Sequence, residues 1–327
     1  MIALYNNHNL YKMKRKSKIM RKFIVVLSLV FIVFILGCTN IPFNPFQNKA
    51  PESTGTGLKL YFGDNAPPRD KIFVGENSRF IVTVFADNWG SAEISDATLK
   101  LWDNIPGTEA LDIDDISLTI EGADVFLNSL GQETRRAPNL KQLLYSNPVS
   151  YNKDNIAEGS QLNIFAELLF NYRVRLQGRM CLSAEEDPTC PATEIISSSQ
   201  LGRDAQHVPV TIDRIQKTAT PLNENEYFVD LEITFRNSGG GFIDDDDGKE
   251  LLRINDGFIK LGDLPFDCSP GTISFADSST ATVNCFISSI SPGQTSQVFP
   301  LNIEYDVPYR MRIQIGPIPL VKVNNDE

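Results

Sequence analysis

The stretch FIVTVFADNWG, residues 80–90, alternates apolar and polar side chains and then ends in an asparagine and a glycine. Phe80, Val82 and Val84 fall on one side of this alternation, as expected of a β-strand with one buried face. Asn88 and Gly90 suit the sharp turn that follows, because both residue types tolerate positive φ. This stretch therefore predicts a half-buried strand that ends at an Asn-x-Gly corner.

The same pattern returns in the second half of the chain as VDLEITFRNSG, residues 229–239. Asn88 then corresponds to Asn237, and Gly90 to Gly239. An internal repeat of this length indicates two copies of one structural unit. We predict two β-sandwich domains in tandem, residues 58–203 and 205–327, with an insertion at about 104–160 in the first.

Short segments with the same two-residue period occupy most of the remaining chain and are separated by Gly, Pro and Asn turns, which is typical of sandwich domains. The further predicted strands are LKLYF (58–62), ATLKLWD (97–103), QLNIFAELLF (161–170), YRVRLQGRMCL (172–182), VPVTIDRI (208–215), GFIKLGDL (257–264), ATVNCFISSI (281–290), SQVFPLNIEYDV (296–307) and RMRIQI (310–315). Only PNLKQLLY, 138–145, predicts a short helix. The predicted fold class is all-β.

The N-terminus has the pattern of an export signal. A basic segment, 11–22, precedes the uncharged run 23–36, which as a helix would span roughly 21 Å against the ~30 Å of a bilayer core. We therefore predict a signal peptide over 1–37. ILGC, 35–38, resembles a lipobox, which makes Cys38 the predicted lipidation site and 38–57 a flexible tether. The alternative is an uncleaved anchor helix; both place the body outside the cytoplasm, fastened to the membrane.

Four cysteines remain beside Cys38: Cys181, Cys190, Cys268 and Cys285. Four cysteines allow three pairings, and the domain division favours Cys181–Cys190 and Cys268–Cys285. Disulfides need an oxidising compartment, which agrees with export. A four-cysteine zinc site is the competing interpretation, but the gaps within each pair are too wide for the usual spacing.

Charge and composition limit the partners. The chain has a net charge of −11 although its first 37 residues are basic, so the folded part is strongly acidic and nucleic acid is not expected to bind it. Asp244, Asp245, Asp246 and Asp247 form an acidic run that is a weak calcium candidate. A solvated loop explains the same run, and we predict no other cofactor.

Catalytic patterns are scarce. His8 lies in the predicted signal segment, which leaves His207, and one histidine cannot build a three-histidine zinc site. No nucleophile elbow or phosphate-binding loop occurs in the sequence. Trp89 and Trp102 invite a carbohydrate-binding interpretation, although a tryptophan in a sandwich more often packs on the core. We predict that the chain is not an enzyme.

The order of the segments 66–94, 172–182, 208–215 and 229–241, with the Asn-x-Gly corner, resembles exported archaeal-type lipoproteins with tandem immunoglobulin-like domains of the CARDB kind. This resemblance covers most of 57–327. It implies a cell-surface adhesion or envelope-assembly module with no catalytic residues to transfer. Its partner would be an unknown envelope protein or glycan. The alternative is a solute- or carbohydrate-binding lipoprotein, or a hydrolase, that uses the insertion at 104–160 as a pocket wall.

Overall fold

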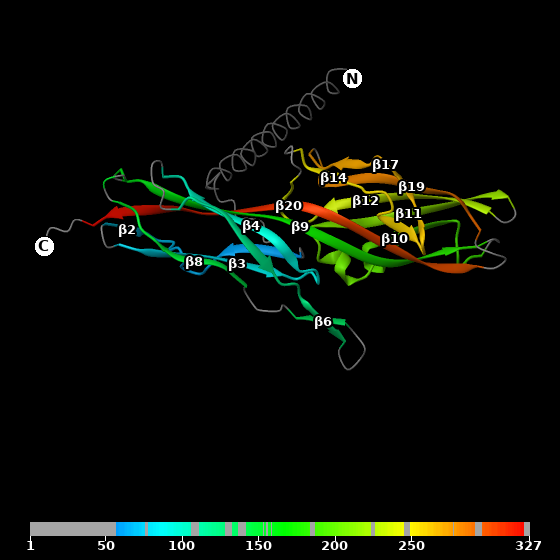
Figure 1. The fold of residues 1–327 in the computed structure, drawn as a ribbon, viewed down its shortest axis with the longest axis horizontal. Coiled ribbons are helices and arrows are strands. Elements are labelled where there is room, and N and C mark those ends of the chain that lie inside the picture. Colours follow the sequence, from blue (N-terminus) through cyan, green and yellow to red (C-terminus); the bar gives the residue numbers. More distant parts are fainter. Residues whose placement is uncertain are drawn as a thin grey trace, which may run out of the picture. The chain divides into compact units, whose positions relative to one another are not determined.

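The fold is described from a computed structural model of the chain. It describes residues 57–75, 78–105, 111–127, 133–136, 142–152, 154, 156–157, 159–183, 187–223, 226–244, 249–276, 278–291 and 296–323. The chain divides into two compact units, 1–49 and 50–327, and every strand named below lies in the second. Most described residues are in strands and none is in an α-helix, so the predicted all-β sandwich class is confirmed (Figure 1).

Three strands from the start of the described chain form an antiparallel sheet in the order β1-β3-β8. Their bounds are Leu58–Phe62, Phe80–Asn88 and Gln142–Val149. In β3 the side chains of Phe80, Val82 and Val84 are buried, as the alternation predicts. The sheet therefore has one core face and one outer face.

The largest sheet has eight strands and contains the two longest, β9 (Gln161–Leu182) and β20 (Gln297–Lys322). The other six are β2 (Ile72–Val74), β4 (Ile94–Asp103), β5 (Ile113–Ile120), β13 (Phe242–Ile243), β15 (Ile259–Leu261) and β16 (Leu264–Pro265). β4 pairs with the first part of β9, and β15 pairs with the first part of β20.

A five-stranded sheet in the order β10-β11-β12-β19-β17 forms the outer layer of the second half. Its strands are β10 (Thr193–Ser197), β11 (Val210–Asn223), β12 (Glu226–Asn237), β19 (Thr280–Ile290) and β17 (Asp267–Ser269). The 3-10 helices η2 (Ser198–Gln200) and η3 (Arg203–Gln206) connect β10 to β11. Two small two-stranded sheets pair β14 (Leu251–Arg253) with β18 (Thr272–Ser274) and β6 (Asp124–Leu127) with β7 (Glu133–Arg136).

β9 and β20 run side by side and antiparallel through both halves of this unit (Figure 1). The pair Asn171–Pro308 lies near the middle of the whole paired stretch. The part of β9 before Asn171 pairs with β4, and the part of β20 before Pro308 pairs with β15. Each half of the unit is thus completed by the first part of one long strand and the last part of the other.

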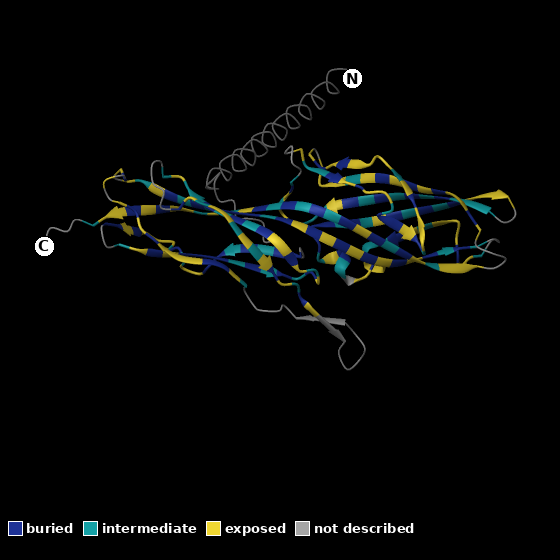
Figure 2. Ribbon diagram, viewed as in Figure 1, coloured by how far each residue is buried: buried dark blue, intermediate teal, exposed yellow. Residues whose placement is uncertain are grey.

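The buried apolar residues of these two strands lie on one face of the sheet, and this face contributes to a single hydrophobic core that includes both halves (Figure 2). In the second half the ring of Phe235 on β12 meets Tyr305 of β20 edge-on, with centroids 5.4 Å apart. Tyr305 also donates a hydrogen bond to the Val210 carbonyl on β11, at 2.8 Å. These contacts fix the five-stranded sheet onto the eight-stranded one.

The Asn-x-Gly corners of the repeat have the same hydrogen bonds in both copies. Asn88 donates through Nδ2 to the Ala92 carbonyl at 2.8 Å and accepts from the Gly90 amide at 3.0 Å. Asn237 makes the equivalent bonds to the Gly241 carbonyl, at 3.0 Å, and from the Gly239 amide, at 3.3 Å. The sequence-level alignment of the two corners therefore matches their structure.

From the sequence we attributed the glycines at the two corners to a need for positive φ. That explanation is wrong, because neither Gly90 nor Gly239 has positive φ. A tyrosine hydroxyl occupies the place where their side chains would be. A Cβ atom on Gly90 would collide with the hydroxyl of Tyr172, and one on Gly239 with that of Tyr309. Tyr172 follows Asn171 in β9 and Tyr309 follows Pro308 in β20, so the two corners meet the long strands at equivalent places.

Two details of the predicted strands are corrected. The segments 161–170 and 172–182 form one strand, β9, and the segments 296–307 and 310–315 fall within or beside one strand, β20. The predicted helix at 138–145 is wrong over 142–145, which begins β8; the rest of that segment lies outside the described residues. The bounds 58–203 and 205–327 stay a prediction, since β9 and β20 are shared across them.

Candidate functional site

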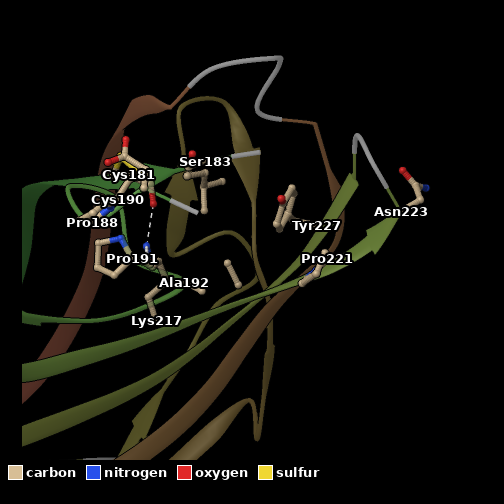
Figure 3. Close-up of a pocket in the computed structure, with 13 residues that line it drawn as sticks. Cys181, Ser183, Pro188, Cys190, Pro191, Ala192, Lys217, Pro221, Asn223 and Tyr227 are labelled. Carbon is tan, nitrogen blue, oxygen red and sulfur yellow. Dashed lines mark hydrogen bonds between the residues drawn. A yellow bond between two sulfur atoms is a disulfide. The ribbon is translucent and has the colours of Figure 1, made fainter. Parts of the chain in front are cut away.

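A cleft lies in the second half, between the loop that follows β9 and the hairpin that joins β11 to β12 (Figure 3). Its volume is about 760 Å³. Pro188, Pro191 and Ala192 line the loop side, while Pro221 and Tyr227 line the hairpin side. Prolines and a tyrosine are stiff side chains, so the walls of this cleft lose little conformational entropy when a ligand binds.

The loop side is held by a disulfide and a buried lysine. Cys181, near the end of β9, bonds to Cys190, which closes the loop. Lys217 of β11 lies beneath it with no exposed side-chain surface and donates to the carbonyls of Cys181 and Pro191, at 2.7 Å each (Figure 3). Its Nζ is also 3.3 Å from a carboxylate oxygen of Glu194, which is opposite it on β10.

Burial lowers the pKa of Lys217, and the Glu194 carboxylate acts in the opposite direction. The Nζ atom donates hydrogen bonds to two backbone carbonyls and lies within ion-pair distance of Glu194. Lys217 is therefore a structural anchor for the loop, and its ammonium group is not presented to a ligand in the cleft.

Asp187 is the acidic group of the cleft. It accepts hydrogen bonds from the amide of Thr189 at 2.8 Å and from its hydroxyl at 2.7 Å, and a third from the Ser296 hydroxyl. These bonds, Ser296 first, lower the pKa of Asp187. Ser296 also lies 2.9 Å from the Ser183 hydroxyl, so the turn before β20 is tied to the loop after β9.

The described residues that line the cleft offer groups for binding. Asp187 is the carboxylate among them, and Ser183 and Asn223 add polar groups to the rim. A carboxylate disfavours an anionic ligand, whereas hydroxyl groups can donate to it. The arrangement suits a neutral, hydroxyl-bearing or cationic ligand of modest size.

Both predicted disulfides are present in the structure. Cys268 lies directly opposite Cys285 in the pairing of β17 with β19, and the two are bonded. Disulfides are typical of proteins in oxidising compartments, so they indicate an exported protein. Cys38 and the segments 1–37 and 38–56 lie outside the described residues. No helix in the described ranges is long and apolar enough to cross a membrane.

Of the predicted calcium ligands, only Asp244 lies within the described residues. Asp244 donates its amide to the Pro308 carbonyl and pairs with Arg310 at 3.2 Å. Asp245, Asp246 and Asp247 lie outside the described residues. Within the described part of the chain no three His, Cys, Asp or Glu side chains gather as a metal site would require.

The two tryptophans and His207 fall in different places. Trp102 is on the outer face of β4, stacked on Phe165 with centroids 5.4 Å apart, and the Arg312 guanidinium is 5.2 Å from its ring centre. Trp89 donates its amide to the Gly57 carbonyl at the corner after β3. His207 follows η3 at the junction of the two halves, where a Cβ on Gly57 would collide with its carbonyl.

The described residues of 104–160, the predicted pocket wall, line neither this cleft nor a smaller hollow beside Asn171 and Pro308. Sequence reasoning missed Lys217, although a signal existed. Ile215, Lys217 and Ala219 occupy alternate inward positions of β11, so the lysine stands where an apolar side chain is expected.

The sequence matches no protein-family model, and no curated protein resembles it at a significant level.

Proposed function

We propose that this chain is a non-enzymatic, lipid-anchored cell-surface protein that acts as an adhesion or envelope-assembly module. Three features support this proposal: the lipobox-like ILGC with Cys38, the two disulfides, and the architecture of the folded part, residues 57–323. The observation that carries the proposal is the shared pair β9 and β20, which ties both halves into one elongated support. At about 3.3 Å per residue the paired part of β9 extends roughly 70 Å.

The place where the tether joins the body also supports an anchored role. Gly57 lies at the junction of the two halves, bonded to the Trp89 amide and close to His207. An anchor attached here leaves the far end of each half free for contact with other molecules. A surface protein that bridges or spaces partners benefits from such an arrangement.

Mass spectrometry of the membrane-extracted protein tests the anchor. We expect a mature N-terminus at Cys38 that carries lipid, and we expect Cys38→Ser to release the body from the membrane fraction. A Cys38→Ser protein that stays membrane-bound at its unprocessed mass would overturn the lipid anchor in favour of an uncleaved helix.

A second candidate function is the binding of a solute or carbohydrate in the cleft beside the Cys181–Cys190 loop. It is favoured by the rigid walls and by the hydroxyl-compatible rim around Asp187. Binding to the native state raises the unfolding temperature. Titration with maltose as a neutral probe should raise it, and Ala192→Trp, which fills the cleft from an exposed position, should abolish the effect. An unchanged melting temperature at high maltose would count against this candidate.

A further inference from the structure

The outer face of the sheet β1-β3-β8 carries apolar side chains in an unusual arrangement. Across one row lie Tyr61, Phe85 and Leu143 of three neighbouring strands. The rings of Tyr61 and Phe85 stack with centroids 5.8 Å apart, and Leu143 is 55% exposed. Further along the same face Ile81, which is 52% exposed, is opposite Pro148.

The internal repeat supplies a matched comparison for this face. Under the alignment of Asn88 with Asn237, the outward residues Ile81, Thr83 and Phe85 correspond to three residues of β12. Those residues are Asp230, Glu232 and Thr234. The second copy of the same strand therefore has a charged and polar outer face, on which Glu232 pairs with Arg214 at 3.3 Å. Because the fold tolerates polar residues at these positions, its stability does not require the apolar ones in the first copy. Exposed apolar patches of this kind mark interaction sites.

Arg79, just before β3, and the alternate residues of β3 that follow it form a self-complementary series: Arg79, Ile81, Thr83, Phe85 and Asp87. The base and the acid stand at opposite ends, the two large apolar side chains lie inside them, and Thr83 is at the centre. A two-fold axis through Thr83 would place Arg79 of one copy against Asp87 of the other and Ile81 against Phe85. An isologous contact needs such a pattern, in which residue i meets j and j meets i.

The centre of the face is recessed. Thr83 is only 8% exposed, with the Phe85 ring near Gly63 on one side and Ser146, whose hydroxyl is 3.4 Å from that of Thr83, on the other. The larger side chains stand on both sides of this low centre. Two such sheets can pack face to face in the manner of a sandwich, about 10 Å apart.

We propose that the outer face of β1-β3-β8 is a homotypic contact surface, which binds the same face of a second copy of this chain. Strand spacing and rise give the face roughly 400 Å² per copy, about half the ~800 Å² per partner of a standard interface. The contact is accordingly weak in solution, and anchoring many copies on one surface raises their effective concentration. In this respect the inference rests on the proposed adhesion function, to which it adds the identity of the partner.

Sedimentation equilibrium of the full chain in density-matched detergent tests the contact with two charge reversals. We expect the wild-type mass to approach that of a dimer as concentration rises, and R79D and D87K each to stay monomeric. The R79D copy has acid at both ends of the series and the D87K copy has base at both ends. An equimolar mixture of the two variants should therefore associate at least as strongly as the wild type.

The matched control is R236D. Arg236 of β12 corresponds to Asp87 in the alignment of the two copies, and reversing its charge should leave association unchanged. Ile81→Ser with Leu143→Ser, both at exposed positions, should abolish association without loss of secondary structure by circular dichroism. A wild type that is monomeric throughout, a mixture that does not associate, or a loss of association in R236D would each overturn the proposal. None of these results affects the lipid mass at Cys38, so failure of the contact and failure of the anchor are separate outcomes.

Discussion

At the scale of single residues, the corners after β3 and β12 show how a glycine can be required without positive φ. Gly90 and Gly239 make room for the hydroxyls of Tyr172 and Tyr309. In the second copy the Tyr309 hydroxyl donates to Asn237 at 2.7 Å and accepts from the Gly241 amide at 2.9 Å. The corner thus connects a turn of one sheet to a long strand of the other.

We predict that Gly90→Ala destabilises the protein through its collision with the Tyr172 hydroxyl, by about 1–3 kcal/mol as for other overpacked sites. Tyr172→Phe removes the colliding atom. The double variant should therefore be more stable than the sum of the single effects predicts, by at least about 1 kcal/mol in urea unfolding. Strict additivity would show that the hydroxyl does not set the requirement for glycine.

A second residue-scale prediction concerns the pH dependence that Lys217 causes. Burial lowers its pKa in the folded protein, so between that pKa and its ordinary value of about 10.4 the unfolded chain binds more protons at this site. Its contribution to the free energy of unfolding therefore rises with pH across that interval.

Comparing wild type with Lys217→Met separates the pH dependence caused by Lys217 from that caused by the tyrosines, which also titrate at alkaline pH. The difference in unfolding free energy, wild type minus variant, should increase from neutral pH towards pH 10. A difference that is constant or shrinks would contradict the assignment.

At the scale of elements, the two disulfides hold short segments to the sheet. Cys268–Cys285 ties β17 to β19, and Cys181–Cys190 closes the loop beside the cleft. In the chain-entropy model loops of this size are worth about 3 kcal/mol each. Replacing either pair by serine should lower the free energy of unfolding by roughly that amount, and no change on reduction would show that the loops are already ordered without the bonds.

Alternation of apolar and polar residues was enough to locate β1, β3, β4, β11, β12 and β19, because each buries one face. It was not enough to show that β9 and β20 are continuous. Asn171 and Pro308 are turn-forming residue types, yet here they lie opposite each other at the centre of the paired strands. The continuity of β9 and β20 becomes evident only from their pairing with each other. The local sequence pattern does not predict pairing between segments so far apart in the chain.

The wrong helix prediction at 138–145 has a local cause. Leu144 and Tyr145 are both buried, and the register between β3 and β8 shifts at this point. Such a bulge places two consecutive residues on the core side, which imitates the spacing of a helix. The cleft was equally out of reach, because its two walls, the loop after β9 and the β11–β12 hairpin, come together only in the folded sheet.

At the scale of the whole molecule, the exchange of long strands joins the two halves of residues 50–327. The first half needs the end of β20, and the second half needs the end of β9. The outer face of this pair adds ion pairs between the strands, Arg173 with Asp306 at 2.9 Å and Arg312 with Glu167 at 2.6 Å. Exposed pairs are worth little, but the Glu167 side chain is only 9% exposed, so its bond to Arg312 matters more.

The central claim is that β9 and β20 make the two copies of the repeat one cooperative body. Differential scanning calorimetry of the full chain tests it most directly. We predict one unfolding transition for the body, with a van't Hoff enthalpy equal to the calorimetric enthalpy. Two resolved transitions, or a calorimetric enthalpy well above the van't Hoff value, would show that the halves unfold separately and would contradict the account.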